Sequence, residues 1–333
     1  MGASVTLSVV VPVFNEASGL DALHERVSST LRHAGVAYEI VLVDDGSRDG
    51  SWERMAALAE RDPHLVLVRL SRNFGHQVAI TAGLDHACGE AVVVMDADLQ
   101  DPPEVVPQMI ERWRAGYDVV YGRRERRLGE GLFKRATASL FYRLVRRLTA
   151  VEIPADTGDF RLMSRRAVEA FRSLQERNRF VRGMVAWVGF RQTAVDYVRE
   201  ARHAGETKYP VRKMVRFAGD AIFSFSHVPL RFATGLGLAS STAGFGYAVY
   251  AILARVLGWP TVQGWASLMV AIIFLVGVQL ISLGIIGEYI GRIYDEVKAR
   301  PLYLTDTVVR GQAAASRLRA EGLPREESVL RSR

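Results

Sequence analysis

Cysteine is almost absent from this chain, since Cys88 is the single one among 333 residues. One cysteine can form no internal disulfide and cannot build a metal site from several thiolates. We therefore expect a reducing compartment around Cys88. Two nucleotide-binding signatures are also missing: G-x-G-x-x-G after the first expected strand, and G-x-x-x-x-G-K-[ST] anywhere. A dinucleotide oxidoreductase and a P-loop NTPase are thus unsupported.

Charge is missing from two long stretches. Residues 232–254 and 259–287 contain no charged side chain, and Arg255 lies between them. A helix needs about 20 apolar residues to cross a bilayer, so we predict two transmembrane helices at about 232–254 and 265–287. The first stretch is rich in Gly, Ala and Ser, which suits close helix packing in lipid. Two buried helices of a soluble protein are the alternative interpretation.

Flanking charges predict the topology. Basic residues precede the first uncharged stretch and follow the second. They are Lys213, Arg216, Arg231, Arg292, Lys298 and Arg300. The positive-inside rule then places both flanks in the cytoplasm. The segment VTLSVVVPVF is short and has no basic leader, so we expect no signal peptide. The prediction is a multi-pass protein of the inner (plasma) membrane, with its first 230 residues and both termini in the cytoplasm.

The remaining charge is unevenly distributed. Residues 1–111 carry a net charge of −10, and residues 112–231 carry +14. Within the basic section, residues 131–150 and 211–230 alternate apolar and basic side chains as amphipathic helices do. Such helices beside a membrane anchor suit an anionic lipid surface, although packing against a soluble core is the alternative. Because the same chain carries two spans, we expect a membrane and no nucleic-acid partner.

The first 120 residues alternate strand-like and helix-like patterns. The expected strands are 9–13, 39–43, 65–70, 91–95 and 118–121, and the expected helices are 17–33, 51–61, 76–88 and 103–114. This alternation predicts an α/β fold, a mostly parallel sheet with helices on both faces. Ligands of such sheets bind at the carboxyl ends of the strands.

Acidic residues follow three of the expected strands. Glu16 comes after the first, Asp44 and Asp45 after the second, and Asp96 and Asp98 after the fourth. Clustered carboxylates repel one another unless a cation or a donor-rich ligand lies between them. Mg²⁺ and Mn²⁺ take carboxylate oxygens together with phosphate and water. We therefore predict a Mg²⁺ or Mn²⁺ site at Asp96, Asp98 and Gln100, while a solvated turn is the alternative for each motif alone.

The ordered motifs VVPVFNE, VDDGSRDGS and MDADLQDPPE resemble those of the family-2 glycosyltransferases, which have the GT-A fold. SRNFGHQVAITAGLDHACG, TGDFRL and GETKY resemble the branch that glycosylates polyprenyl phosphates, such as dolichol-phosphate mannose synthases. LGIIGEYIGRIYDEVKARPLY resembles the bacterial two-span members, of the undecaprenyl-phosphate glucosyl and aminoarabinose transferase types. The Q-x-x-R-W of processive synthases is not found. The resemblance covers roughly residues 7–305.

The resemblance implies a metal-dependent, usually inverting transfer of a sugar from a nucleotide diphosphate donor to a lipid monophosphate. Asp159 takes the family's catalytic position, as base or sugar-orienting carboxylate, with Asp156 as the fallback. Asp98 supports catalysis as a metal ligand, and Lys208 with Arg123 (or Arg124) are the expected phosphate clamps. Donor binding is expected from Pro12, Phe14, Glu16, Asp44, Asp45 and Asp96. His76 and Gln77 either reach the diphosphate or only begin a helix.

The expected organisation is a cytosolic catalytic domain at 1–210, a juxtamembrane helix at 211–230, two spans within 231–290 and a cytosolic tail at 291–333.

Expected partners are a UDP-sugar or GDP-sugar, with UDP favoured, a polyprenyl (undecaprenyl) phosphate, the membrane, and further copies in a homo-oligomer, a tetramer by resemblance. Three alternatives remain open. They are a dolichol-phosphate mannose synthase-like enzyme that uses GDP-mannose, a transferase with a non-lipid saccharide acceptor, and a non-catalytic binding module. The sequence does not name the sugar.

Overall fold

The computed structural model describes residues 6–125, 157–200, 226, 228–257 and 264–310. The chain forms two compact units. One comprises Met1–Tyr142, Val151–Val211 and Pro301–Arg333, and the other comprises Arg143–Ala150 and Arg212–Arg300. The amphipathic segments predicted at 131–150 and 211–230 lie almost wholly outside the described residues. Each unit is described by itself below.

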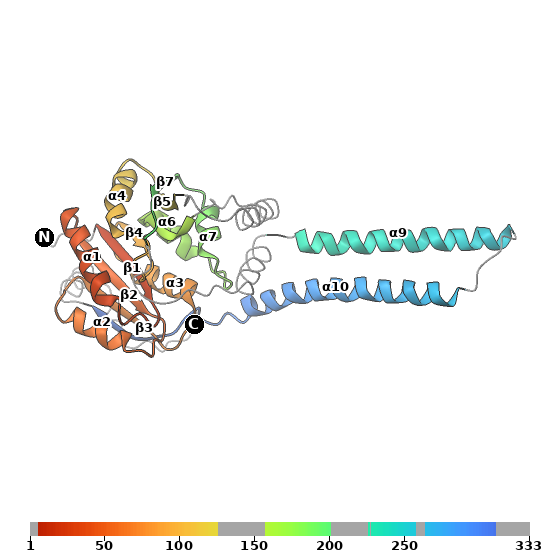
Figure 1. Ribbon diagram of the computed structural model, residues 1–333, viewed down its shortest axis with the longest axis horizontal. Helices are drawn as coiled ribbons and strands as arrows, with labels where there is room; N and C mark the ends of the chain where they lie inside the picture. The colour runs from red at the N-terminus through yellow and green to blue at the C-terminus, as the bar shows by residue number, and fades with distance from the viewer. Residues whose placement is uncertain (1–5, 126–156, 201–225, 227, 258–263, 311–333) are drawn as a thin grey trace. The chain divides into compact units, whose positions relative to one another are not determined.

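The first unit is built on one sheet with the strand order β7-β5-β6-β4-β1-β2-β3-β8 (Figure 1). β6 and β8 run antiparallel to their neighbours and the other strands run parallel to one another. The strands are β1 (Leu7–Val13), β2 (Tyr38–Asp44), β3 (Leu65–Leu70), β4 (Ala91–Val94), β5 (Val119–Arg124), β6 (Thr157–Ser164), β7 (Gln192–Tyr197) and β8 (Thr305–Arg310). The expected mostly parallel sheet is thereby confirmed.

Helices cover both faces of this sheet, as expected for strands that are buried on both sides. One face packs against α1 (Leu20–His33), α2 (Ser51–Ala59) and α4 (Val106–Arg114), which follows the short helix η1 (Pro103–Val105). The other face packs against α3 (His76–His86), which contacts α6 (Arg165–Ser173), and α6 contacts α7 (Val181–Trp187).

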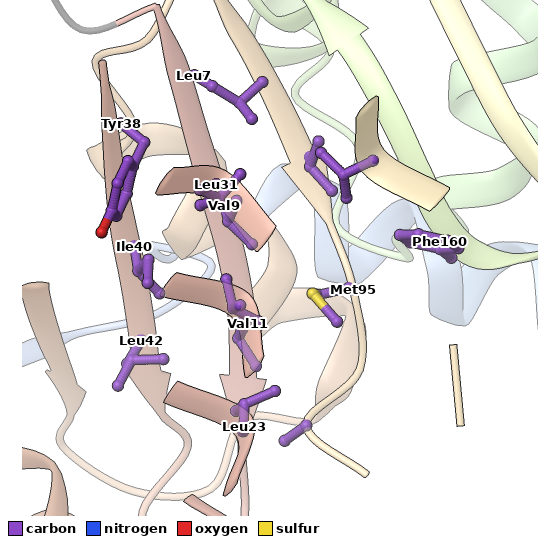
Figure 2. Packing of buried hydrophobic residues seen from close by; sticks show 14 of the residues in the cluster. Leu7, Val9, Val11, Leu23, Leu31, Tyr38, Ile40, Leu42, Met95 and Phe160 are labelled. Carbon is purple, nitrogen blue, oxygen red and sulfur yellow. The ribbon is translucent and has the colours of Figure 1, made fainter. Parts of the chain in front are cut away.

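The main hydrophobic core lies between the sheet and the helices α1, α2 and α4. Alternate residues of β1, such as Val9 and Val11, point toward Leu23 and Leu31 of α1 (Figure 2). This pattern follows from the side-chain repeat of each element. Every second residue of a strand lies on one face of the sheet, and every third or fourth residue of a helix lies on one face of the helix. On the opposite face, α3 approaches β1 closely, since a β-carbon at Gly83 of α3 would lie 2.2 Å from the Val10 side chain.

The second unit contains α9 (Val228–Val256) and α10 (Trp265–Val297), which pack against each other. The Tyr289 hydroxyl donates to the Ser226 carbonyl at 2.5 Å. Val228–Ala254 and Val270–Val297 are long and apolar enough to cross a membrane, with mean hydropathies of 1.3 and 2.5. Most of their described large apolar side chains are exposed, as a surface facing lipid requires. Both helices extend past the predicted spans, and α10 continues to Val297.

Candidate active site

The sheet order brings the predicted acidic residues to one edge. β4, β1 and β2 are parallel neighbours, so their carboxyl ends, which precede Asp96, Phe14 and Asp45, lie side by side. β6 runs the opposite way and therefore begins at this edge, with Arg161 paired to Val94. Asp159, two residues earlier on β6, thus reaches the carboxyl ends of strands that precede it by more than 60 residues.

Asp159 accepts hydrogen bonds from several side chains at this edge, and it is only 4% exposed. Arg182 donates two hydrogen bonds to it, Nε to Oδ1 at 2.9 Å and Nη2 to Oδ2 at 3.2 Å. His76 Nε2 lies 3.3 Å from Oδ2, and Gln77 Nε2 donates to the same oxygen at 3.4 Å. Arg161 Nη2 is 3.6 Å from Oδ1. Burial raises the pKa of Asp159, but these partners outweigh it and hold the pKa well below its ordinary value.

We call Asp159 with His76, Gln77, Arg161 and Arg182 the Asp159 cluster. Asp96 lies next to it, with Oδ1 3.5 Å from His76 Nε2. This oxygen is buried and has no hydrogen-bond partner among the described residues. Burial raises the pKa of Asp96 to about 6, and the nearby Asp159, Asp101 and Asp98 carboxylates add to the increase while His76 opposes it. A buried carboxylate oxygen without a donor is costly, so Asp96 is suited to a cation.

Asp98 and Gln100 form a tight turn after β4. The Gln100 N–H donates to Asp98 Oδ1 at 3.2 Å, and Leu99 between them has a φ of +55°. Within the described part of the chain, no group of three or more His, Cys, Asp and Glu side chains could hold a metal ion. Asp96 and Asp98 nevertheless fit Mg²⁺ or Mn²⁺, since these ions bind through one or two carboxylates, with phosphate oxygens and water completing the shell.

Asp44 and Asp45 hold neighbouring loops in place. Asp45 accepts from the backbone N–H groups of Phe74 at 2.7 Å and Gly75 at 2.9 Å, which fixes the loop before His76. Asp44 Oδ1 accepts from the Ser47 N–H at 3.0 Å, and its Oδ2 is buried without a hydrogen-bond partner in the described residues. The observed role of Asp45 is therefore structural, and base or ribose binding by either residue stays a prediction.

The residues expected to bind the donor after β1 lie at the same edge. Pro12 is within β1, paired with Val43 of β2. Phe14 is 48% exposed, and an exposed aromatic residue is one on which a base could stack. The Glu16 N–H donates to Ser51 Oγ at 3.0 Å, so the end of β1 is tied to the start of α2.

Of the two arginines at the end of β5, Arg124 and not Arg123 faces the acidic edge. Arg123 forms an exposed bidentate ion pair with Asp196 of β7, at 2.5 and 2.7 Å. Successive strand residues point to opposite faces, and Arg124 accordingly lies 3.5 Å from the buried Asp101, to which the Tyr197 hydroxyl also donates. The phosphate clamp expected at Arg123 or Arg124 stays a prediction, and of these two residues Arg124 is the one that lies near Asp101. Lys208 and Asp156 lie outside the described residues.

Sequence reasoning missed Arg182 and Arg161. Arg161 is part of TGDFRL, but no spacing rule connects Arg182 with Asp159, which lies 23 residues away. Residues 112–231 contain 26 basic side chains, so composition could not single out one arginine. The one available signal was the position of Arg182 in a short apolar helix, where a charged residue usually has a partner.

A mostly parallel sheet with covered faces and this acidic edge agrees with the GT-A glycosyltransferase fold expected from the motifs. Residues 8–172 match Glycosyl transferase family 2 and residues 228–293 match the GtrB C-terminal hairpin, and the chain belongs to glycosyl transferase family 2. It is 49% identical over 304 residues to an uncharacterized glycosyltransferase, YkcC, of Bacillus subtilis, with 91% of this chain and 94% of the relative covered.

Two further relatives are named for a lipid acceptor. The chain is 44% identical to the SfII prophage-derived bactoprenol glucosyl transferase of Shigella flexneri, with 92% of this chain and 99% of the relative covered. It is 43% identical to a prophage bactoprenol glucosyl transferase homolog of Escherichia coli, with 91% and 99% covered. The chain is thus a glycosyltransferase with two candidate membrane helices, and the predicted family and fold are confirmed.

Proposed function

We propose that this protein transfers a sugar, with glucose as the first to test, from a UDP-sugar to undecaprenyl phosphate. The relatives named for bactoprenol match along 99% of their length, including the hairpin, which supports the same acceptor class. The observation that carries the proposal is the junction of Asp96 with the Asp159 cluster. The Asp96 carboxylate, which is suited to a cation, lies there beside His76, and His76 also approaches Asp159, which binds Arg182. Arg182 and protonated His76 are cations that suit phosphate.

Asp96, Asp98 and Gln100 are the residues proposed to hold Mg²⁺ or Mn²⁺, which when bound would offset the charge that develops on the leaving diphosphate. The buried, unpartnered Oδ1 of Asp96 supports this assignment. Phe14, which is exposed at this edge, is the residue proposed to stack on the base, and Arg124, which lies near Asp101, is the proposed cationic partner of the phosphate.

The acceptor needs little help from a base. A phosphate monoester has a second pKa near 6, so it is largely a dianion at neutral pH and is already nucleophilic. Asp159 is ionised and bonded to several donors, which makes it a poor proton acceptor. Its proposed role is therefore to organise the cationic groups around it.

The membrane topology is also a proposal. β8 follows α10 in the chain and pairs with β3, which precedes α9, so the segments on both sides of the hairpin join one sheet. Such a chain must cross the membrane an even number of times. This supports two spans with both flanks, and hence the catalytic residues, on the cytoplasmic side that the basic flanks indicate.

Thiol labelling tests this topology. In a Cys88→Ser background, Thr261→Cys in the connecting loop should react with an impermeant maleimide in intact cells. Ser316→Cys, after β8, should react only after lysis. Equal labelling of both positions in intact cells would contradict the proposal.

Lipid extraction tests the transfer. Membranes that contain the full-length protein and undecaprenyl phosphate are supplied with radiolabelled UDP- and GDP-sugars, and label in the organic phase is counted. We expect UDP-glucose to label the lipid, EDTA to abolish transfer, Mg²⁺ or Mn²⁺ to restore it, and Asp98→Ala to lose at least 100-fold. Labelling from GDP-mannose alone would favour the mannose synthase alternative. A donor that is hydrolysed without labelling lipid would favour another acceptor.

The domain limits and the homo-tetramer remain predictions, and the second can be tested by the mass of the purified protein in nanodiscs.

A further inference from the structure

Asp159 has two arginine partners that differ in where they point. Arg161 is 5% exposed, and its guanidinium also donates to the carbonyls of Asp159 and Gly158, at 3.3 and 2.9 Å. Burial lowers the pKa of Arg161 to about 10, so it stays charged at neutral pH. Arg182 is 27% exposed and approaches the carboxylate from α7. Arg161 is therefore a buried counter-charge, while Arg182 lies at the surface of the cluster.

The position of Arg182 is fixed from several directions. Gln77 of α3 accepts from the Val181 N–H at 2.9 Å through Oε1 and donates to Asp159 through Nε2, so one side chain connects α3, α7 and β6. Asp159 accepts hydrogen bonds from two guanidinium N–H groups of Arg182. A bidentate ion pair of this kind fixes the plane of the guanidinium. A preorganised phosphate-binding group needs such a fixed orientation.

We propose that Arg182 contacts a phosphoryl oxygen of the substrate and that Asp159 acts through Arg182 as a positioning residue. This inference rests on the proposed function. A proton acceptor at Asp159 would first have to lose its hydrogen bonds, whereas a guanidinium fork with five donors can hold a carboxylate and a phosphate together. The Asp96 carboxylate beside the cluster places the proposed metal, and therefore phosphate, within the same edge of the sheet. The phosphoryl oxygen belongs either to the donor diphosphate or to the acceptor monophosphate.

The test is a double-mutant cycle on the full-length protein in nanodiscs with undecaprenyl phosphate. The variants are Arg182→Gln, Arg182→Lys, Asp159→Asn and the double variant. Arg166→Gln is the matched control, because Arg166 also makes a bidentate pair with a buried aspartate, Asp118, at the opposite edge of the sheet. For each protein, kcat and KM for donor and lipid, UDP affinity by calorimetry and thermal midpoint are measured.

We expect Arg182→Gln and Asp159→Asn each to lower kcat/KM at least 100-fold, with Arg166→Gln within threefold of the original protein. If Asp159 acts through Arg182, the double variant should be no more than about threefold worse than Arg182→Gln, since residues that act as a unit are not additive. Arg182→Lys, which keeps the charge but loses the fork, should recover part of the loss.

The two phosphoryl sources give different results. Weaker UDP binding in Arg182→Gln assigns the contact to the donor, and unchanged UDP binding with a raised KM for the lipid assigns it to the acceptor. The inference is overturned if Arg182→Gln behaves like Arg166→Gln, or if the two losses multiply as independent steps do. It is also overturned if activity falls only in parallel with the thermal midpoint, which indicates a structural pair. If the original protein binds UDP but labels no lipid, the proposed acceptor fails, and UDP binding by Arg182→Gln still decides whether Arg182 contacts the donor diphosphate.

Discussion

Gly46 lies at the acidic edge, between Asp45 and Ser47, with a φ of +72°. A β-carbon at this position would lie 2.6 Å from the Asn73 backbone nitrogen and 2.7 Å from the Arg72 carbonyl carbon. Backbone atoms cannot move aside as a flexible side chain can. Glycine is therefore required here both by the left-handed conformation and by the close approach of the loop that leads to His76.

The substitution Gly46→Ala should accordingly damage the site. Gly35→Ala is the matched control, because Gly35 has a φ of +63° and no described atom within 4 Å of an added β-carbon. We expect Gly35→Ala to cost about 1 kcal/mol of stability through backbone strain alone, and transfer to remain near normal. Gly46→Ala should lower transfer at least tenfold, measured with the lipid-extraction assay. Similar activity in the two variants would contradict the close approach.

Arg123 and Arg124 offer a second comparison between adjacent residues. Arg123 lies in an exposed ion pair, while Arg124 reaches toward buried Asp101 on the acidic side. We expect Arg123→Gln to leave kcat/KM within about twofold, because exposed pairs contribute little. Arg124→Gln should lower it at least tenfold. The reverse order would favour Arg123 as the phosphate clamp.

At the scale of helices and strands, Asp62 connects three elements. It follows α2 and lies 2.7 Å from His24 Nε2 of α1, and it also lies 2.7 Å from His64 Nδ1, just before β3. The His64 N–H donates to the same carboxylate at 2.9 Å. Burial raises the pKa of Asp62, but these partners outweigh it and lower the pKa below its ordinary value. The carboxylate therefore stabilises the folded sheet when it is ionised.

A carboxylate with a lowered folded-state pKa contributes stability above its unfolded pKa, about 4, and loses it as the pH falls through the folded value. We expect Asp62→Asn to destabilise the sheet unit by about 2 kcal/mol at pH 7, with the difference shrinking below pH 4. Hydrogen exchange of α1 amides in the full-length protein measures it. Asp21→Asn, which removes an exposed pair with Arg54, is the control and should change little. A difference that stays constant down to pH 3 would contradict this role of ionised Asp62.

At the scale of the whole molecule, the strand after the hairpin completes the catalytic sheet. β8 pairs with β3, the Ser71 N–H donates to the Leu304 carbonyl at 2.9 Å, and the Tyr303 hydroxyl donates to Asp85 at 2.9 Å. Ser71 begins the loop that Asp45 holds and that leads to His76. The chain after α10 therefore pairs with the edge of β3, which would otherwise be an unpaired strand edge prone to aggregation. It also supports the loop that leads to His76.

Two truncations separate this role from that of the rest of the tail. Removal of residues 304–333 should lower the thermal midpoint by about 5–10 °C, since several backbone hydrogen bonds of roughly 1 kcal/mol are lost. It should also reduce transfer. Removal of residues 311–333 alone leaves β8 in place and should change neither quantity. Equal midpoints for the two truncated proteins would show that β8 does not stabilise the sheet.

The sequence by itself determined the α/β class, the first strands and helices, and the two apolar helices. These features depend on local periodicity and on the length of uncharged segments, which can be read without neighbours. It also placed Asp96 and Asp98 at the edge, because parallel strands share their carboxyl ends, and it singled out Asp159 because the motifs resemble those of a known family. Their catalytic and metal-binding roles stay predictions.

Only the tertiary structure decided which charged groups meet. β6 runs antiparallel and delivers Asp159 to Asp96, α7 brings Arg182 from 23 residues further along the chain, and strand alternation separates Arg123 from Arg124. β8, within the segment expected to be a tail, pairs with a strand more than 230 residues away. Such contacts depend on strand order and direction in the sheet. Composition and spacing within one chain do not encode that order.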